Sequence, residues 1–330
     1  MSDPAPLVLG VPSKGRLQEA TVSFFERAGL PIRKKGGARD YRGTIDGLDG
    51  VEVAFLSASE IAGELAAGSV HLGVTGLDLV YEKLAVPDEK MVTVAPLGFG
   101  FANVVVAVPD SWIDVQTMDD LEDVAASFRA SHKRPMRLAT KFVRLTRQHF
   151  RKHGVADYQI VESLGATEGA PASGAADLIV DITTTGATLD ANHLRVLAGD
   201  NGTILRSEAT LMAARGADWS GGQQATLRAI LDRVAAQHRA GSVYEVRVVV
   251  AEQAKTSRQA VDAFGCSVPF GAVAGQGQLV LHCPRERIWD LVAFLKGKGA
   301  GTVTVGELSY VADDSVGRFN GVYAALGIAN

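Results

Sequence analysis

The chain has very little cysteine, since Cys266 and Cys283 are the only two among 330 residues. Two cysteines are too few for a disulfide framework, and they fit a reducing compartment. No charged N-terminal segment followed by an apolar core marks an export signal. No uninterrupted apolar stretch is long enough to span a bilayer. These absences predict a cytoplasmic protein with no membrane partner.

An excess of charge of one sign is also missing, because the formal net charge is −4 and the pI is about 6.0. That balance gives no sequence-wide case for nucleic acid as a partner. Two familiar nucleotide-binding signatures are absent as well. There is no Gly-x-x-x-x-Gly-Lys-Ser/Thr loop and no Gly-x-Gly-x-x-Gly motif after a strand. A site for an anionic small molecule must therefore come from another pattern.

The sequence does contain a repeated alternation of strand-like and helix-like segments. Hydrophobic residues make up 47% of the chain and charged residues 21%, as is typical of a globular protein. A chain of 330 residues is too long for one ordinary core. Apolar runs at residues 7–11, 51–56 and 104–108 alternate with helical patterns, which predicts α/β domains with mostly parallel sheets. Ser57 and Glu60 form a capping-box pair at the start of one helix.

We expect two lobes with a cleft between them and a third, smaller domain. By analogy, the chain is expected to cross back through residues 195–212. The first lobe then comprises residues 1–100 and 197–219, and the second comprises residues 101–196. Residues 220–330 are expected to form a regulatory or assembly domain. Its order of strand, helix, strand, strand, helix, strand is ferredoxin-like if a further strand lies around Val268 to Val273.

The segment from Asp177 to Leu189 is the most informative part of the chain. It begins as an apolar run typical of a buried strand and then breaks into hydroxyl residues around Gly186. Open α/β sheets bind ligands in the loops that follow their strands. Threonine hydroxyls and amides around a glycine suit a phosphate, and Asp181 is placed to approach a sugar hydroxyl or a metal ion. The alternative is a threonine-rich turn with a satisfied aspartate.

Two further segments bear on chemistry. Lys14 and Arg16 lie on a glycine-containing turn before the first helix, where cations beside a helix N-terminus suit pyrophosphate or triphosphate. The alternative there is a solvated basic turn. The small-residue loop at 165–171 carries Glu168, which either contacts sugar hydroxyls or a metal ion or stabilises a helix start.

Four segments, taken in order, resemble the ATP phosphoribosyltransferase family, which catalyses the first step of histidine biosynthesis. They are Pro12-Ser13-Lys14-Gly15-Arg16-Leu17, His71-Leu72-Gly73-Val74-Thr75-Gly76-Leu77-Asp78, residues 165–171 and residues 177–189. The resemblance covers most of residues 7–215, and the continuous block at 165–189 is its most specific part. The C-terminal part resembles, more loosely, the regulatory domain of the family's long form.

The resemblance implies a two-lobed core like that of periplasmic binding proteins and an ACT-like C-terminal domain. It implies a pentosyltransferase that joins N1 of ATP to C1 of phosphoribosyl pyrophosphate and releases pyrophosphate, with Mg²⁺ as cofactor. It also implies a homo-oligomer, a hexamer or a dimer, that histidine inhibits.

The resemblance further implies roles for individual residues. Glu168 and Asp181 are expected to hold Mg²⁺ through the substrate. The residues expected to be catalytic are Lys14, Arg16, Glu168 and Asp181. Phosphoribosyl pyrophosphate is expected to bind at Asp181, Thr183, Thr184, Thr185, Gly186, Ala187 and Thr188. ATP is expected to bind at Lys14, Gly15, Arg16, Leu17, Gly76 and Asp78.

The sequence departs from the family pattern in several places. Ser13 separates Pro12 from Lys14, and Ser57 stands where many members carry an arginine. Arg39 or Arg42 is a substitute suggested by charge and by proximity in sequence. Residues 252–278 and the tail after Val311 fit the long form poorly.

Two other functions remain open from the sequence. One is a cytoplasmic small-molecule-binding protein built like a periplasmic receptor. The other is a phosphoribosyltransferase for another base. Such enzymes commonly carry two adjacent acids before the threonine loop, whereas here Ile182 follows Asp181.

Overall fold

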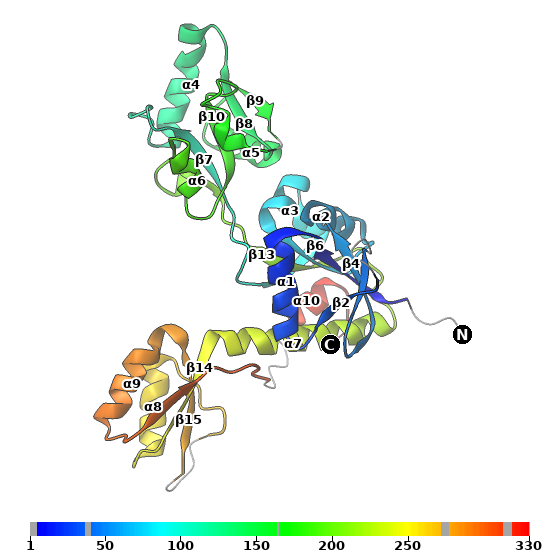
Figure 1. Ribbon diagram of the computed structural model, residues 1–330, viewed down its shortest axis with the longest axis vertical. Helices are drawn as coiled ribbons and strands as arrows, with labels where there is room; N and C mark the ends of the chain where they lie inside the picture. The colour runs from blue at the N-terminus through cyan, green and yellow to red at the C-terminus, as the bar shows by residue number, and fades with distance from the viewer. Residues whose placement is uncertain (1–4, 37–40, 164, 272–276, 313–318, 330) are drawn as a thin grey trace.

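The computed structural model describes residues 5–36, 41–163, 165–271, 277–312 and 319–329. These residues form three sheets of seven, six and three strands. Figure 1 shows the corresponding three bodies: lobe I in the middle, lobe II above it, and a small C-terminal domain beside the end of one long helix. The expected α/β architecture with two lobes and a further domain is confirmed.

Lobe I contains a seven-stranded sheet in the order β2-β3-β4-β1-β5-β13-β6. Its strands are β1 (Leu7–Pro12), β2 (Ile32–Lys34), β3 (Arg42–Ile45), β4 (Leu48–Leu56), β5 (Leu72–Gly76), β6 (Met91–Pro96) and β13 (Ala209–Ala214). Its helices are α1 (Gly15–Arg27), α2 (Ala58–Ala67) and α3 (Leu77–Lys83), with a 3₁₀ turn at Pro87–Glu89. Leu9, Val53 and Leu72 of the central strands have no solvent exposure, and full burial of each such side chain contributes about 1.5–3 kcal/mol.

Lobe II contains a six-stranded sheet in which β11, β7, β10, β8 and β9 are neighbours in that order and β12 also pairs with β7. Its strands are β7 (Asn103–Pro109), β8 (Met136–Thr140), β9 (Tyr158–Glu162), β10 (Leu178–Thr183), β11 (Leu194–Val196) and β12 (Thr203–Leu205). Its helices are α4 (Met118–His132), α5 (Val143–Lys152) and α6 (Ala187–Ala191), with 3₁₀ turns at Thr167–Gly169 and Asp200–Gly202.

The prediction of mostly parallel sheets is wrong, because both sheets are mixed. In lobe II, β8 pairs in parallel with β9 and β10, whereas β7 runs antiparallel to β10, β11 and β12. In lobe I, β13 runs antiparallel to both β5 and β6. At the opposite edge of the lobe I sheet, β3 also runs antiparallel to β2 and β4. The strands β7 and β13, which begin at the crossings between lobes, run against the parallel strands β10 and β5 beside which they enter.

The return crossing lies later than expected. Strands β11 and β12 pair with β7 of lobe II, and lobe I resumes only at β13. Residues 197–205 therefore belong to lobe II, and the boundary at residue 197 is corrected to residues 206–208. The physical reason is that the ladder hydrogen bonds of β7 are satisfied by these two short strands.

The C-terminal domain comprises β14 (Val243–Val248), α8 (Gln253–Phe264), β15 (Leu279–Pro284), α9 (Ile288–Gly297) and β16 (Val303–Gly306), with a 3₁₀ turn at Arg285–Arg287. The strand order is β15-β14-β16, and both pairs are antiparallel. This is the ferredoxin-like order with one edge strand reduced. In the described part of the strand expected at Val268 to Val273 there is no strand, and Ser267 makes a single bridge to His282. Val273 lies outside the described residues.

Two helices within residues 220–330, the range expected to form the C-terminal domain, belong instead to the core of lobe I. They are α7 (Gly222–Ser242) and α10 (Asn320–Ala325), and Figure 1 shows both beside α1. Their buried side chains join one cluster with Leu7, Leu9 and Phe25: Leu227, Ile230, Leu231, Val234, Val322, Tyr323 and Leu326. The boundary at residue 220 is therefore corrected, because burial of apolar area places these helices on the lobe I sheet.

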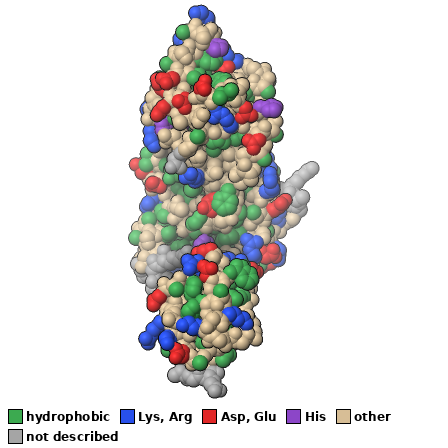
Figure 2. Space-filling model, turned by 90° about the vertical axis from the view of Figure 1, so that its left-hand side faces the viewer, with side chains coloured by type: hydrophobic (Ala, Val, Ile, Leu, Met, Phe, Trp, Pro, Cys, Tyr) green, Lys and Arg blue, Asp and Glu red, His purple; other side chains and the backbone are tan. Residues whose placement is uncertain are grey.

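Local signals are confirmed in the helix starts. Ser57 accepts a hydrogen bond from the Glu60 amide at 3.2 Å, and the Glu60 carboxylate accepts one from the Ser57 amide at 2.8 Å. Within the described ranges no helix combines the length and apolar character needed to cross a bilayer. On the face in Figure 2, acidic and basic side chains both occur over lobe II, lobe I and the C-terminal domain.

Candidate functional site

The loops singled out in the two lobes both lie beside the crossings. In lobe I, Gly76 at the end of β5 pairs with Ala209 at the start of β13. In lobe II, Thr183 at the end of β10 pairs with Asn103 at the start of β7. Because β7 and β13 begin where the chain enters each lobe, the loops after β5 and β10 face the boundary between the lobes. The expected cleft between the two predicted binding edges therefore has a structural basis.

A cavity of about 290 Å³ lies at the edge of lobe II. It brings together three of the predicted residues, namely Glu168, Asp181 and Thr188. It also contains Lys141 and Thr167, which the sequence analysis did not identify. A volume near 300 Å³ lies at the lower end of small-molecule sites, so the cavity suits a small ligand.

The electrostatics of this cavity centre on Asp181. Burial raises the pKa of its carboxyl above the ordinary value, the nearby Glu168 carboxylate adds to this rise, and the ammonium of Lys141 opposes it. The Lys141 Nζ lies 3.8 Å from Asp181 Oδ1. Two acids and one cation at one wall are suited to hydroxyl groups and to a metal ion that a phosphate shares.

The loop at 165–168 holds a strained residue. Ala166 has φ 50° and ψ 39°, in the left-handed region that costs free energy for a residue other than glycine. Thr167, which is 3% exposed, anchors the next position by donating a hydrogen bond to Ser163 Oγ at 3.1 Å. This backbone geometry places Glu168 at the cavity.

The predicted phosphate loop has some of its polar groups already engaged. Thr183 Oγ1 accepts a hydrogen bond from the Gly186 amide at 2.8 Å, and Thr184 Oγ1 donates one to the carbonyl of Phe101 at 2.8 Å. Thr185 Oγ1 accepts a long one from the Ala187 amide at 3.4 Å. The first hydrogen bond within α6 runs from the Asp190 amide to the Gly186 carbonyl. The amide of Thr188 lies before Asp190 in the helix and so is not used in that first bond. Of these four threonines only Thr184 donates its hydroxyl hydrogen, so the hydroxyls of Thr183, Thr185 and Thr188 are left to donate to a ligand.

The predicted residues of lobe I divide into exposed and packed ones. Lys14, Gly15 and Arg16 are exposed at the start of α1, and Gly15 has φ +72°. Lys14 lies close enough to Glu60 to help lower the pKa of that carboxyl. Leu17 packs against the lobe I core instead. Within the described residues, neither Lys14 nor Arg16 makes an ion pair of its own, so both cations are available to an anion in the cleft.

Gly76 and Asp78 form a compact turn at the crossing. A Cβ on Gly76 would clash with Asp78 Oδ1, which Ser207 holds in place, so glycine is favoured there. Asp78 is 6% exposed, accepts a hydrogen bond from Ser207 Oγ at 2.7 Å, and donates its amide to the same oxygen at 3.0 Å. Burial raises the pKa of its carboxyl, partly offset by these bonds and by Lys141. Asp78 thus lies against the crossing rather than in open solvent.

We predict that Asp78→Asn will stabilise the protein more at pH 7.5 than at pH 4. The raised pKa means that the folded state favours the neutral carboxyl of Asp78. The neutral carboxyl therefore stabilises the fold fully at a pH below the pKa of Asp78 in the unfolded chain. This stabilisation is lost as the pH rises through the pKa of Asp78 in the folded protein. Each tenfold change in proton affinity corresponds to about 1.4 kcal/mol. Urea denaturation of both proteins at the two pH values measures the difference.

Ser207→Ala provides the opposite control for this prediction. It leaves the buried carboxyl without its hydroxyl partner and should destabilise the protein by about 1–3 kcal/mol, more at high pH. If Asp78→Asn changes the free energy of unfolding equally at both pH values, the pKa of Asp78 is not raised by burial.

Arg39 and Arg42 were suggested as substitutes for the arginine that many family members carry at the position of Ser57, and the structure supports neither. Arg39 lies outside the described residues. Arg42 begins β3 and pairs with the Glu52 carboxylate on the neighbouring strand. Ser57 is engaged in its capping box, as described above. In the described part of the chain, no group of three or more His, Cys, Asp and Glu side chains is arranged to hold a metal ion.

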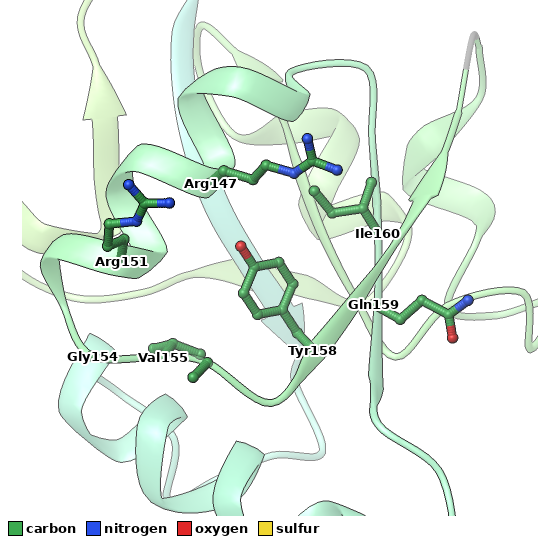
Figure 3. A pocket seen from close by; sticks show the side chains of 8 residues that line it. Arg147, Arg151, Gly154, Val155, Tyr158, Gln159 and Ile160 are labelled. Atoms are coloured by element: carbon green, nitrogen blue, oxygen red, sulfur yellow. The ribbon is translucent and has the colours of Figure 1, made fainter.

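A second cavity, of about 600 Å³, lies between α5 and β9. Figure 3 shows Arg147 and Arg151 extending from α5, with the Tyr158 hydroxyl pointing toward that helix. Burial raises the pKa of Tyr158, and the two guanidinium groups oppose this rise. This cavity shares no lining residue with the one around Asp181, and it contains none of the residues predicted from the sequence.

The residue most clearly missed by sequence analysis is Lys141. It directly follows β8, which pairs in parallel with β10, so its position at the same carboxyl edge obeys the rule used for the threonine loop. The available signal was a cation immediately after a buried apolar strand. It required knowing that β8 and β10 are neighbours.

Comparisons with known proteins give one consistent result. Residues 57–236 match the family described as ATP phosphoribosyltransferase. A protein of that name from Bradyrhizobium diazoefficiens is 57% identical over 323 residues, covering 98% of each chain. One from Nitrobacter winogradskyi is 58% identical over 308 residues, covering 93% of this chain and 94% of the other.

Among solved structures, a chain of the ATP phosphoribosyl transferase (HisG:HisZ) complex from Thermotoga maritima superposes with a TM-score of 0.53. It is 22% identical in sequence and covers 69% of this chain and 96% of its own length. At that identity the likeness supports the fold of the two lobes.

Proposed function

The chain belongs to the ATP phosphoribosyltransferase family, and from that premise we propose that the cavity around Asp181 binds the ribose of phosphoribosyl pyrophosphate. The family joins N1 of ATP to C1 of this donor and releases pyrophosphate, which is the first step of histidine biosynthesis. The observation that carries the proposal is the convergence of Glu168, Asp181, Lys141 and Thr188 on one cavity at the carboxyl edge of lobe II. Family membership favours this activity over a binding protein or a transferase for another base.

The 5-phosphate is assigned to the loop at 183–188. Thr188 lines the cavity directly, and Gly186, with φ +84°, turns the chain into α6. Thr183 Oγ1 accepts a hydrogen bond from the Gly186 amide, so the hydroxyl hydrogen of Thr183 can still be donated to a phosphate oxygen. Thr184 is assigned a structural part, since its hydroxyl donates to Phe101.

The two carboxylates are assigned to the ribose hydroxyls and to Mg²⁺. Magnesium in proteins is commonly held by one or two carboxylates together with substrate phosphates, and Glu168 and Asp181 at one cavity fit that donor set. When bound, the ion would neutralise charge on the departing pyrophosphate. Lys141, 3.8 Å from Asp181, favours the ionised form of that carboxylate and so opposes the rise in its pKa that burial causes.

The side chains act on a reaction whose charge changes are known. As the bond from C1 to pyrophosphate lengthens, the ribose gains oxocarbenium character and the leaving group gains negative charge. Asp181 and Glu168 stabilise the positive ribose, while Lys14 and Arg16 meet phosphates from the lobe I side of the cleft. Leu17 fixes the start of α1 by packing on the core. Positioning of two anionic substrates supplies the remaining acceleration.

On the lobe I side, we assign ATP to the edge formed by the turn at residues 14–17 and by Gly76. Asp78 shapes this edge through its bonds to Ser207 rather than by contact with the nucleotide. Arg16 and Lys14 have no competing ion pair among the described residues. That leaves their charge available to the triphosphate.

We further propose that histidine inhibits the enzyme through the C-terminal domain and that the chain forms a homo-oligomer, a hexamer or a dimer, in the cytoplasm. The domain is small, and Figure 1 shows lobe I between it and lobe II, the lobe whose residues line the cavity. It exposes apolar side chains at Val249, Trp289 and Val305, which are suited to subunit contacts. Activity of the purified chain titrated with histidine, together with its mass by light scattering, tests both statements.

The overall assignment is tested by mixing the chain with Mg²⁺, ATP and phosphoribosyl pyrophosphate and recording the ultraviolet change of an N1-substituted adenine. Within that assay, Thr185→Val should raise KM for phosphoribosyl pyrophosphate about tenfold, because a hydrogen bond to a charged group contributes about 1.5–3 kcal/mol. KM for ATP and the melting temperature should change little.

Thr44→Val on β3 of lobe I is the matched control, with both Michaelis constants expected to stay within twofold. Unchanged kinetics in Thr185→Val would remove that residue from the phosphate loop.

A further inference from the structure

We infer that Glu82 is a positioning residue that holds the two lobes at their working separation. It lies in the last turn of α3 in lobe I, yet its carboxylate binds α5 of lobe II. Glu82 Oε1 accepts a hydrogen bond from the Arg144 amide at 2.9 Å, and Oε2 accepts one from the Leu145 amide at 3.0 Å. Figure 1 shows α3 at the top of lobe I and α5 at the bottom of lobe II.

The contact is reciprocal. Arg144 Nε donates to the main-chain carbonyl of Glu82 at 3.0 Å. The carboxylate therefore receives two backbone donors while its own backbone receives a guanidinium donor. Three hydrogen bonds between the two helices restrain both the distance and the angle between them more than a single bond would.

Glu82 supplies what α5 lacks in its own sequence. The N-cap of α5 is Phe142, which offers no side-chain cap. The first amides of a helix have no intrahelical partner and favour a negative charge. Here a carboxylate from the other lobe takes that place, so opening of the lobes would leave the amides of Arg144 and Leu145 without it.

The opposite end of α3 is tied to the crossing. Asp78, in its first turn, binds Ser207 on the return crossing, and the Ser207 carbonyl accepts a bond from the Ala102 amide of the outgoing crossing. The seven-residue helix α3 thus connects both crossings to lobe II. Hydrogen bonds at its two ends therefore link the crossings to the start of α5 through α3.

The start of α5 is next to the proposed ribose site. Only Phe142 stands between Lys141 and α5 in the sequence. The Phe142 amide donates a hydrogen bond to Thr140 Oγ1 at 2.8 Å. Lys141 reaches Asp181 in the cavity. Glu82 therefore sets where this part of lobe II stands relative to the cations of lobe I. This step rests on the proposed function of the cavity.

The test measures lobe separation and catalysis in the same full-length variants. Spin labels are placed on exposed helix positions with Glu19→Cys on α1 and Ala126→Cys on α4, because the native Cys266 and Cys283 are buried. Pulsed EPR gives the distance distribution between the lobes. Glu82→Ala should shift or broaden it, and Glu82→Gln, which keeps one acceptor oxygen, should do so less. Glu89→Ala, an exposed acid of lobe I, is the matched control.

Kinetics give the second readout. Glu82→Ala should lower kcat/KM by roughly tenfold to a hundredfold, because displacement of a positioned group by about 1 Å has effects of that size. The loss should fall mainly on kcat, with KM for phosphoribosyl pyrophosphate nearly unchanged, since its site lies within lobe II. A folded Glu82→Ala variant with the distance distribution of the parent would overturn the inference.

A shifted distribution with unchanged kcat would also overturn it, provided that Asp181→Asn is impaired in the same assay. If Asp181→Asn is fully active, the proposed function fails instead. The EPR result then decides alone whether Glu82 holds the lobes.

Discussion

Replacing Asp181 with asparagine will lower kcat by about a hundredfold to a thousandfold while leaving the fold intact, because it removes the charge that faces the developing oxocarbenium. Asparagine keeps the shape of the side chain and can still accept the Ile182 amide, which bonds Asp181 Oδ1 at 2.8 Å. Steady-state kinetics by the ultraviolet assay measure the change, and a melting curve checks the fold.

The same variant has a pH signature. Burial raises the pKa of Asp181, and only the ionised form stabilises positive charge on the ribose. Activity of the parent should therefore decline as pH falls through a value above that of an ordinary carboxyl. In Asp181→Asn, the fall in activity at low pH that comes from protonation of this carboxyl should disappear.

Asp190→Asn on α6 is the matched control, because Asp190 is an exposed acid close to the same loop. Its kcat should stay within twofold of the parent value. Equal activity of Asp181→Asn and the parent would show that the cavity is not the reaction site.

Tyr323→Ala will destabilise lobe I by about 3 kcal/mol, although the residue lies near the C-terminus. Tyr323 is 7% exposed and packs in the cluster that includes Leu9 and Leu231. The Arg228 guanidinium also stands over its ring at 4.7 Å. Removal of the ring leaves a cavity and deprives Arg228 of this contact. Urea denaturation followed by circular dichroism gives the loss in the free energy of unfolding.

Trp289→Ala on α9 is the control for this prediction. Trp289 is also aromatic but is 79% exposed in the C-terminal domain, so its removal should change the free energy of unfolding by less than about 0.5 kcal/mol. If the two variants are equally stable, α10 is not part of the lobe I core in solution.

The predictions that came true were local. The capping box at Ser57 and the strand before the threonine loop depend on residues a few positions apart, and their hydrogen-bond and periodicity signals are contained in short windows. Asp181 and Glu168 were grouped by the family resemblance, and the structure places both at one cavity.

The missed features all join distant parts of the chain. Glu82 and Arg144 are 62 residues apart, and Asp78 and Ser207 are 129 apart. Neither pair shows a pattern in sequence, because an acid near the end of a helix is equally compatible with solvent. Their roles depend on where the crossings place the two lobes.

The local sequence was sufficient for the α/β class, the loops at the strand ends and the family motifs, since backbone geometry and side-chain periodicity act over a few residues. The tertiary structure decided that residues 197–205 stay in lobe II, that α10 covers lobe I, and that Asp78 is buried at the crossing. The physical reason is that the hydrophobic effect is non-directional: its contribution depends on how much apolar area is buried and not on the orientation of the partners. A short apolar helix or strand can cover any complementary surface, and only the assembled chain determines which one is available.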